Sequence, residues 1–140
     1  MYEYYEPNKK LRKITRGKKK GQLKHASDCV VRAFSKAWGV DWQTAAKRLW
    51  DRGMEIQRVP DEEECWAYYL KPSGIKCIKD GHYMRVHEFA ETTKNTRVKY
   101  IINCPRHLVC VSNGKYYDCW NSGLSTCRKI YIIEPWREDE

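Results

Sequence analysis

Three residues of this 140-residue chain carry side chains suited to nucleophilic chemistry: Cys29, His107 and Asp118. The cysteine is far from the other two in the sequence. The first, Cys29, follows a polar turn at the start of a helical pattern that Ser27 or Asp28 can cap. A thiol at a helix N-terminus lies near unpaired backbone N–H groups and the positive end of the helix dipole, which favour the thiolate. Its position alone fits a small buried hydrophobic residue equally well. The interpretation therefore depends on whether a base reaches Cys29.

A hairpin predicted near the C-terminus supplies a base and a carboxylate. Asn113-Gly114 accepts the positive φ angles of a two-residue type I′ turn, which fixes how the flanking strands pair. Because side chains alternate between faces, His107 and Asp118 share one face, diagonally opposite, with Cα atoms about 7 to 8 Å apart. A hydrogen bond between them would fix the imidazole tautomer and stabilise its cation. Asn121 falls on the opposite face, so we prefer Asp118 as the orienting residue.

The same register makes specific cross-strand pairs. It pairs Ser112 with Lys115, Val111 with Tyr116, Cys110 with Tyr117 and His107 with Trp120. Trp120 is therefore a candidate wall or roof of a cleft at His107.

The sequence pattern places helices first and strands second. The predicted helices cover about residues 28–38, 42–52, 61–70 and 85–93, with Gly39 and Gly53 ending the first two. The predicted strands cover residues 98–103, 107–112, 115–120 and 129–134. We expect one α+β domain over residues 25–140, with N-terminal helices packed against a C-terminal antiparallel sheet.

Residues 1–24 differ from the rest of the chain. They hold nine lysines and arginines and two glutamates, a net of +7 out of the chain's +9. We expect a basic flexible arm or a loosely attached strand. Its cations can replace counterions on nucleic-acid phosphates, or it can be a solvated tail that improves solubility. The residues predicted to contact phosphate are Lys9, Lys10, Arg12, Lys13, Lys18, Lys19 and Lys20.

The cysteines argue against a disulfide framework. There are seven, an odd number, and no apolar stretch near the start resembles a secretion signal, so a reducing, cytoplasmic setting fits better. No run approaches the roughly 18 apolar residues of a membrane span.

A zinc site is the competing use of the C-terminal cysteines. Cys104, His107, Cys110, Cys119 and Cys127 crowd one region. A strand places His107 and Cys110 on opposite faces, however, and paired Cys-x-x-Cys knuckles are absent from the sequence. We therefore expect no metal and no cofactor.

Together these elements resemble the papain-like cysteine peptidase fold, especially its compact bacterial members that cleave leader peptides. The closer likeness is to small phage-encoded domains with an Asp-Cys-Val-Val-Arg-Ala start, a His-Leu-Val strand, a turn and a Tyr-Asp-x-Trp end. These motifs are here residues 28–33, 107–109 and 117–120, and the resemblance spans about residues 22–136.

The resemblance implies roles for particular residues. Cys29 would be the nucleophile, His107 the general base and then acid, and Asp118 the residue that orients His107. Gln22 matches the glutamine that joins the cysteine N–H in the oxyanion hole of such enzymes. It lies seven residues before Cys29 rather than the usual six.

Two functions follow as hypotheses. The first is a cysteine peptidase-like hydrolase that acts on a peptide, isopeptide or related acyl bond of a peptide or protein substrate through a thioester. It would act in the cytoplasm, the host's if the chain is phage-encoded. The alternative is an inactive papain-like binding module whose basic arm engages nucleic acid or an acidic host protein, because a fold does not fix a function.

Overall fold

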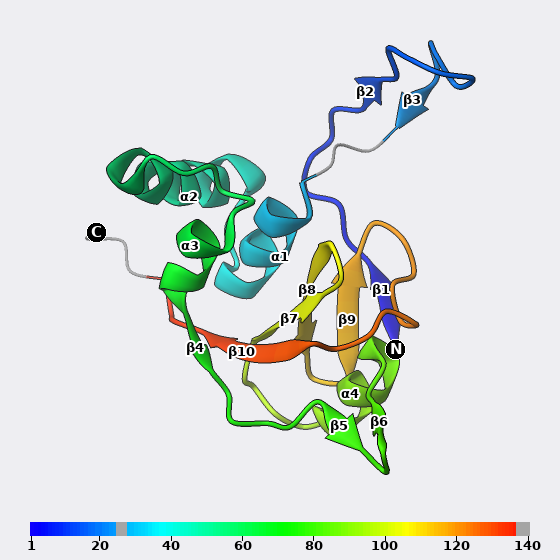
Figure 1. Cartoon of the computed structure of the whole chain (residues 1–140), viewed down its shortest axis with the longest axis vertical. Helices are drawn as coiled ribbons and strands as arrows, with labels where there is room; N and C mark the ends of the chain where they lie inside the picture. The colour runs from blue at the N-terminus through cyan, green and yellow to red at the C-terminus, as the bar shows by residue number, and fades with distance from the viewer. Residues whose placement is uncertain (25–27, 137–140) are drawn as a thin grey trace.

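The computed structural model describes residues 1–24 and 28–136 and has a mixed α+β architecture (Figure 1). The helices of these residues are α1 (Cys29–Trp38), α2 (Trp42–Ile56), α3 (Glu63–Trp66), the 3-10 turn η1 (Ala67–Tyr69) and α4 (Val86–Thr92). The strands are β1 (Tyr2–Tyr4), β2 (Arg12–Lys13), β3 (Leu23–Lys24), β4 (Leu70–Pro72), β5 (Ile78–Lys79), β6 (His82–Tyr83), β7 (Tyr100–Cys104), β8 (His107–Ser112), β9 (Lys115–Asp118) and β10 (Lys129–Ile133). None of the helices within these described ranges is long and apolar enough to cross a membrane.

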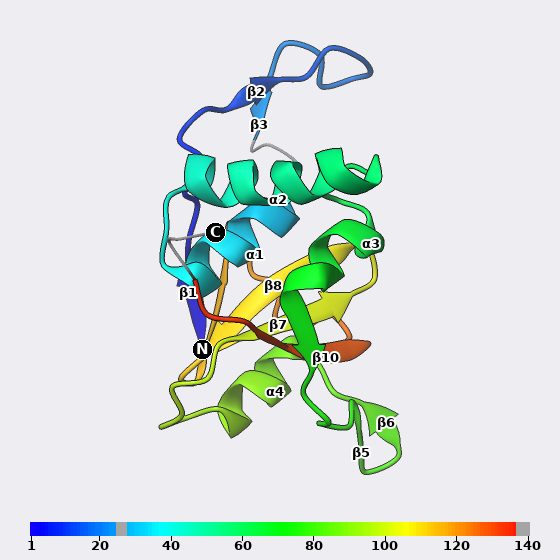
Figure 2. The same cartoon turned by 90° about the vertical axis from the view of Figure 1, so that its left-hand side faces the viewer.

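One six-stranded sheet organises the fold. Its order is β1-β9-β8-β7-β10-β4, and every neighbouring pair is antiparallel except β1 with β9. Residues of β7 alternate between two cores, as the strand period requires. Ile101 packs with α1 and α2, whereas Ile102 packs with α4. Figure 2 shows the resulting layers, with α2 across α1 on one face of the sheet and α4 on the other. The expected packing of N-terminal helices against a mostly antiparallel sheet is therefore confirmed.

The hairpin register predicted from Asn113-Gly114 is also confirmed at three positions. Ser112 pairs with Lys115, Val111 with Tyr116 and Cys110 with Tyr117, and both turn residues have positive φ. The ladder ends there, because the Asp118 carboxylate accepts a hydrogen bond from the Cys119 N–H and the chain leaves the strand.

The N-terminal 24 residues divide into two parts rather than forming one arm. Tyr2–Tyr4 pair with Tyr116–Asp118 as β1, and the Tyr5 N–H donates to the Asp118 carbonyl at 2.8 Å. This pairing provides hydrogen-bond partners for the backbone N–H and C=O groups on the outer edge of β9, which would otherwise be exposed. The basic residues that follow form the β2–β3 hairpin, which projects from the body (Figure 1).

Two helix ends differ from the sequence prediction. The third predicted helix stops at Trp66, because Leu70–Pro72 pair with β10 as an edge strand. The second continues through Gly53 to Ile56 and ends at Gln57, which has a φ of 56°. Gly53 is buried, and a Cβ at this position would collide with the carbonyl oxygen of Arg58. Gly53 therefore permits a close backbone approach and does not end the helix.

Substituting Gly53→Ala should destabilise the protein by about 1 to 3 kcal/mol, the usual cost of overpacking. Helix propensity alone predicts the opposite sign, since alanine is favoured over glycine by about 1 kcal/mol in a helix interior. Urea unfolding measures the difference. Met54→Ala, on the exposed side of the same helix, is the control and should change stability by less than about 0.5 kcal/mol. A stabilised Gly53→Ala protein would contradict the close approach.

Candidate active site

Cys29 is the first residue of α1, directly after Asp28. The Asp28 carboxylate does not cap the helix. It accepts hydrogen bonds from Arg32 at 3.0 Å, Trp42 at 2.7 Å and Asn8 at 3.2 Å instead. Ser27, the other predicted cap, lies outside the described residues. Because the first N–H groups of a helix have no partner within it, the amides beside Cys29 keep their hydrogen-bonding capacity toward a ligand.

His107 begins β8, and its imidazole connects Cys29 with Asp118. Nε2 lies 2.5 Å from Oδ2 of Asp118, whose side chain is buried at 1% exposure, while that of His107 is 10% exposed. The Cys29 side chain acts on the same ring, because its hydrogen bonding and its charge raise the pKa of His107. Since Nε2 is hydrogen-bonded to Asp118, Nδ1 is the ring nitrogen that can interact with the thiol. The structure thus brings together the three residues that the sequence singled out.

The environment of His107 favours its charged form. Burial acts to lower its pKa, but the hydrogen bonds and negative charges of Asp118 and Cys29 outweigh burial and raise the pKa to about 9. At neutral pH the imidazole is therefore an imidazolium, which can stabilise a thiolate beside it.

Asp118 is held by more than His107. Ser122 donates to its Oδ2 at 2.7 Å, and the Arg32 guanidinium lies 3.4 Å from Oδ1. Arg32 is itself buried and also contacts Asp28 at 3.0 Å and Glu6 at 3.7 Å. One buried cation therefore holds carboxylates from the N-terminal segment, from the residue before α1 and from β9. These contacts fix the position of the carboxylate that orients His107.

The other cysteines have a different environment from Cys29. Burial raises the pKa of all six of their thiols: Cys65, Cys77, Cys104, Cys110, Cys119 and Cys127. The pKa reaches about 12 for Cys110 and Cys127, so these thiols stay protonated at neutral pH. Among the described residues no group of three or more His, Cys, Asp or Glu side chains is arranged to hold a metal ion.

A cavity of about 640 Å³ opens over the Cys29–His107 pair. Its walls come from the start of α1, the segment around α3, the β7–β8 turn and the chain after β9. Trp120 lines this cavity, half-exposed, with its ring centroid 5.1 Å from that of His107. Asp61, Trp66, Asn103 and Arg106 complete the outer walls. The space is sufficient for a side chain of a bound peptide.

Gln22 is not brought to this site. It is exposed on the β2–β3 hairpin, where its backbone bonds to Ile14 and Lys19, and it does not line the cavity. The amide side chain in the cavity wall is Asn103. The predicted phosphate contacts, residues 9–20, lie on the same hairpin as Gln22 and away from the cavity walls.

Sequence reasoning missed the residues that support Asp118. Arg32 had a usable signal, because Asp28 and Arg32 are spaced i, i+4 on a helix, where opposite charges meet. Ser122 had none, since it follows the end of β9 in an irregular loop.

Comparisons with protein families, with curated proteins and with solved structures found no match to this chain.

The raised pKa of His107 makes stability depend on pH. The folded protein holds this proton more tightly than the unfolded chain, in which the pKa is near 6.5. The extra stability is fully present below about pH 6.5 and is lost as the pH rises through about 9. In urea unfolding, the stability difference between the wild type and His107→Gln should shrink from pH 6 to pH 9.5. A difference that stays constant across this range would show that His107 is not held as an imidazolium.

Substituting Arg32→Met should cost about 3 to 5 kcal/mol of stability, because Asp28 and Asp118 would stay buried without their cation. The measurement is urea unfolding at pH 7. Lys47→Met is the control, since Lys47 pairs with Asp51 in solvent and such pairs contribute little. Equal stabilities of the two variants would mean that the Arg32 cluster does not hold the fold together.

Proposed function

We propose that this chain is a cysteine hydrolase that acts on a peptide, isopeptide or related acyl bond, with Cys29, His107 and Asp118 as its triad. The observation that carries the proposal is the placement of His107 between the Cys29 side chain, which raises its pKa, and the buried Asp118 carboxylate, with Cys29 and His107 both lining a cavity. A buried structural cysteine needs neither an imidazole at its sulfur nor an orienting carboxylate behind that imidazole.

The reaction follows from this arrangement. The Cys29 thiolate attacks the carbonyl carbon of the substrate and forms an S–C bond, while the carbonyl oxygen becomes an oxyanion. The amides at the start of α1, which the Asp28 side chain does not cap, can donate to that oxyanion. The His107 imidazolium then gives its proton to the leaving group as the scissile bond breaks, which leaves a thioester on Cys29. Neutral His107 next takes a proton from water, whose hydroxide attacks the thioester and releases the acid and the thiolate.

Asp118 acts on His107 rather than on the substrate. Its bond to Nε2 keeps Nδ1 directed at the thiol and stabilises the imidazolium. The arrangement of a nucleophile at a helix start with base and carboxylate on neighbouring strands also supports a papain-like fold. The seven unpaired cysteines support a reducing compartment, the cytoplasm of the cell or of a phage host.

The reactivity of Cys29 tests the proposal. At pH 7, iodoacetamide should alkylate Cys29 faster than any of the other six thiols, with His107→Gln slowing that reaction on the order of ten-fold. Peptide mass spectrometry gives the alkylation rate at each cysteine. Cys77 is the matched comparison, because it is also half-buried, and Cys77→Ala should leave the alkylation rate of Cys29 unchanged. If Cys29 reacts no faster than Cys77, the hydrolase proposal fails.

A small activated ester separates hydrolysis from mere reactivity. With p-nitrophenyl acetate, acylation of Cys29 should release a burst of about one equivalent of nitrophenolate, absent from Cys29→Ala, followed by slow turnover. A reactive Cys29 that stays acylated without turnover would favour the alternative, an inactive binding module.

A further inference from the structure

The β2–β3 hairpin, with the residues that lead into it, is a concentrated positive surface that the proposed hydrolase does not use. We call residues 9–24 the basic hairpin. Eight of its cations are seen to be exposed: Lys9, Lys10, Arg12, Lys13, Arg16, Lys18, Lys19 and Lys20. No Asp or Glu occurs between residues 7 and 24. Within the described part of the chain, none of these eight side chains is in an ion pair with a carboxylate.

The backbone gives these charges a defined shape. Lys13 pairs with Leu23, and the N–H of Ile14 donates to Gln22 at 2.9 Å. Gly17 and Gly21 have positive φ and close the turn between the two strands. At the base of the basic hairpin, the Asn8 side chain donates to Asp28 at the start of α1. The cations are thus presented on a hairpin anchored to the domain.

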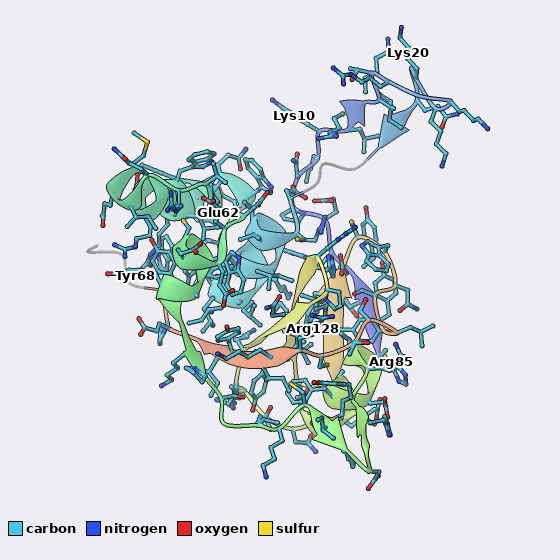
Figure 3. The ribbon with its side chains drawn as sticks, viewed as in Figure 1. Lys10, Lys20, Glu62, Tyr68, Arg85 and Arg128 are labelled. Carbon is cyan, nitrogen blue, oxygen red and sulfur yellow. The ribbon has the colours of Figure 1, made fainter. Side chains whose placement is uncertain are left out.

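The basic hairpin stands clear of the domain. Figure 3 shows Lys10 and Lys20 on the projecting segment, with their side chains directed away from α1 and the sheet. Clustered like charges repel one another and create a positive potential that attracts anions. Their presentation therefore favours binding to a partner with a high density of negative charge.

We propose that the basic hairpin binds the phosphodiester backbone of a nucleic-acid duplex. Residues 9–24 contain no aromatic side chain on which an unpaired base can stack, whereas single-strand binding combines cations with such stacking. A duplex carries about one charge per 1.7 Å, twice the density of one strand. Affinity for an acidic protein would need desolvated anchors in pockets, and the basic hairpin offers exposed lysines instead. Contact is with phosphates and not bases, so binding is independent of sequence.

Fluorescence anisotropy with the full chain and a labelled 30-base-pair duplex of arbitrary sequence tests whether the basic hairpin binds a duplex. If four of the eight cations contact phosphates, the slope of log affinity against log salt is about −3.6, so a four-fold rise in salt weakens binding about 150-fold. Substituting Lys18, Lys19 and Lys20 together by Gln should reduce the steepness of that slope by up to about 2.7. DNA and RNA duplexes should both bind, and more tightly than single strands of the same length.

The matched control removes the same number of positive charges from the opposite end of the molecule. Lys71, Lys76 and Lys79 are exposed around β4 and β5, and their combined replacement by Gln should leave the slope unchanged. Equal effects of the two triple variants would mean attraction by net charge alone and would overturn the assignment to the basic hairpin. Equally tight binding of poly-glutamate would overturn the choice of nucleic acid in favour of an acidic protein. Binding is measured without turnover, so its outcome is separate from that of the hydrolase tests.

Discussion

The buried guanidinium of Arg32 is the interaction on which the rest of this structure depends. It lies between carboxylates from three separate parts of the chain: Glu6, Asp28 and Asp118. Burying one charge is costly unless its partners are buried with it, so these groups stabilise the fold only as a set. The N-terminal segment, the start of α1 and the end of β9 are therefore tied to one point.

The contacts of Arg32 also affect the proposed chemistry of His107. The side chain that would orient His107 is the same carboxylate that Arg32 and Ser122 hold, so its position is fixed by the fold and not by the histidine alone. A carboxylate held this way keeps its charge close to the imidazole and sustains the raised pKa of His107. Stability and the proposed reactivity consequently depend on the same residues.

Local signals were sufficient for the parts of the site that depend on local geometry. The positive φ angles that Asn113-Gly114 tolerates set the register, and the register alone put His107 and Asp118 on one face. Gln22 could not be placed in this way, because residues 23–28 contain no repeating pattern that fixes the direction of the chain before α1. The parallel pairing of β1 was missed for a similar reason: Tyr2–Tyr4 are too short to show a period, and their partner is more than 100 residues away. Gly53 was misread because a helix stop and a close backbone approach both require glycine.

The pairing of β1 with β9 affects the order in which the molecule can assemble. β1 joins a strand that is synthesised more than 100 residues after it, and closing so long a loop carries an entropic cost that slows folding. Until residue 118 has been synthesised, β1 has no edge to join, Arg32 lacks its β9 carboxylate, and Cys29 lies at the start of a helix without an oriented base. The nascent chain therefore carries Cys29 and His107 without the carboxylate of Asp118 until β9 has emerged.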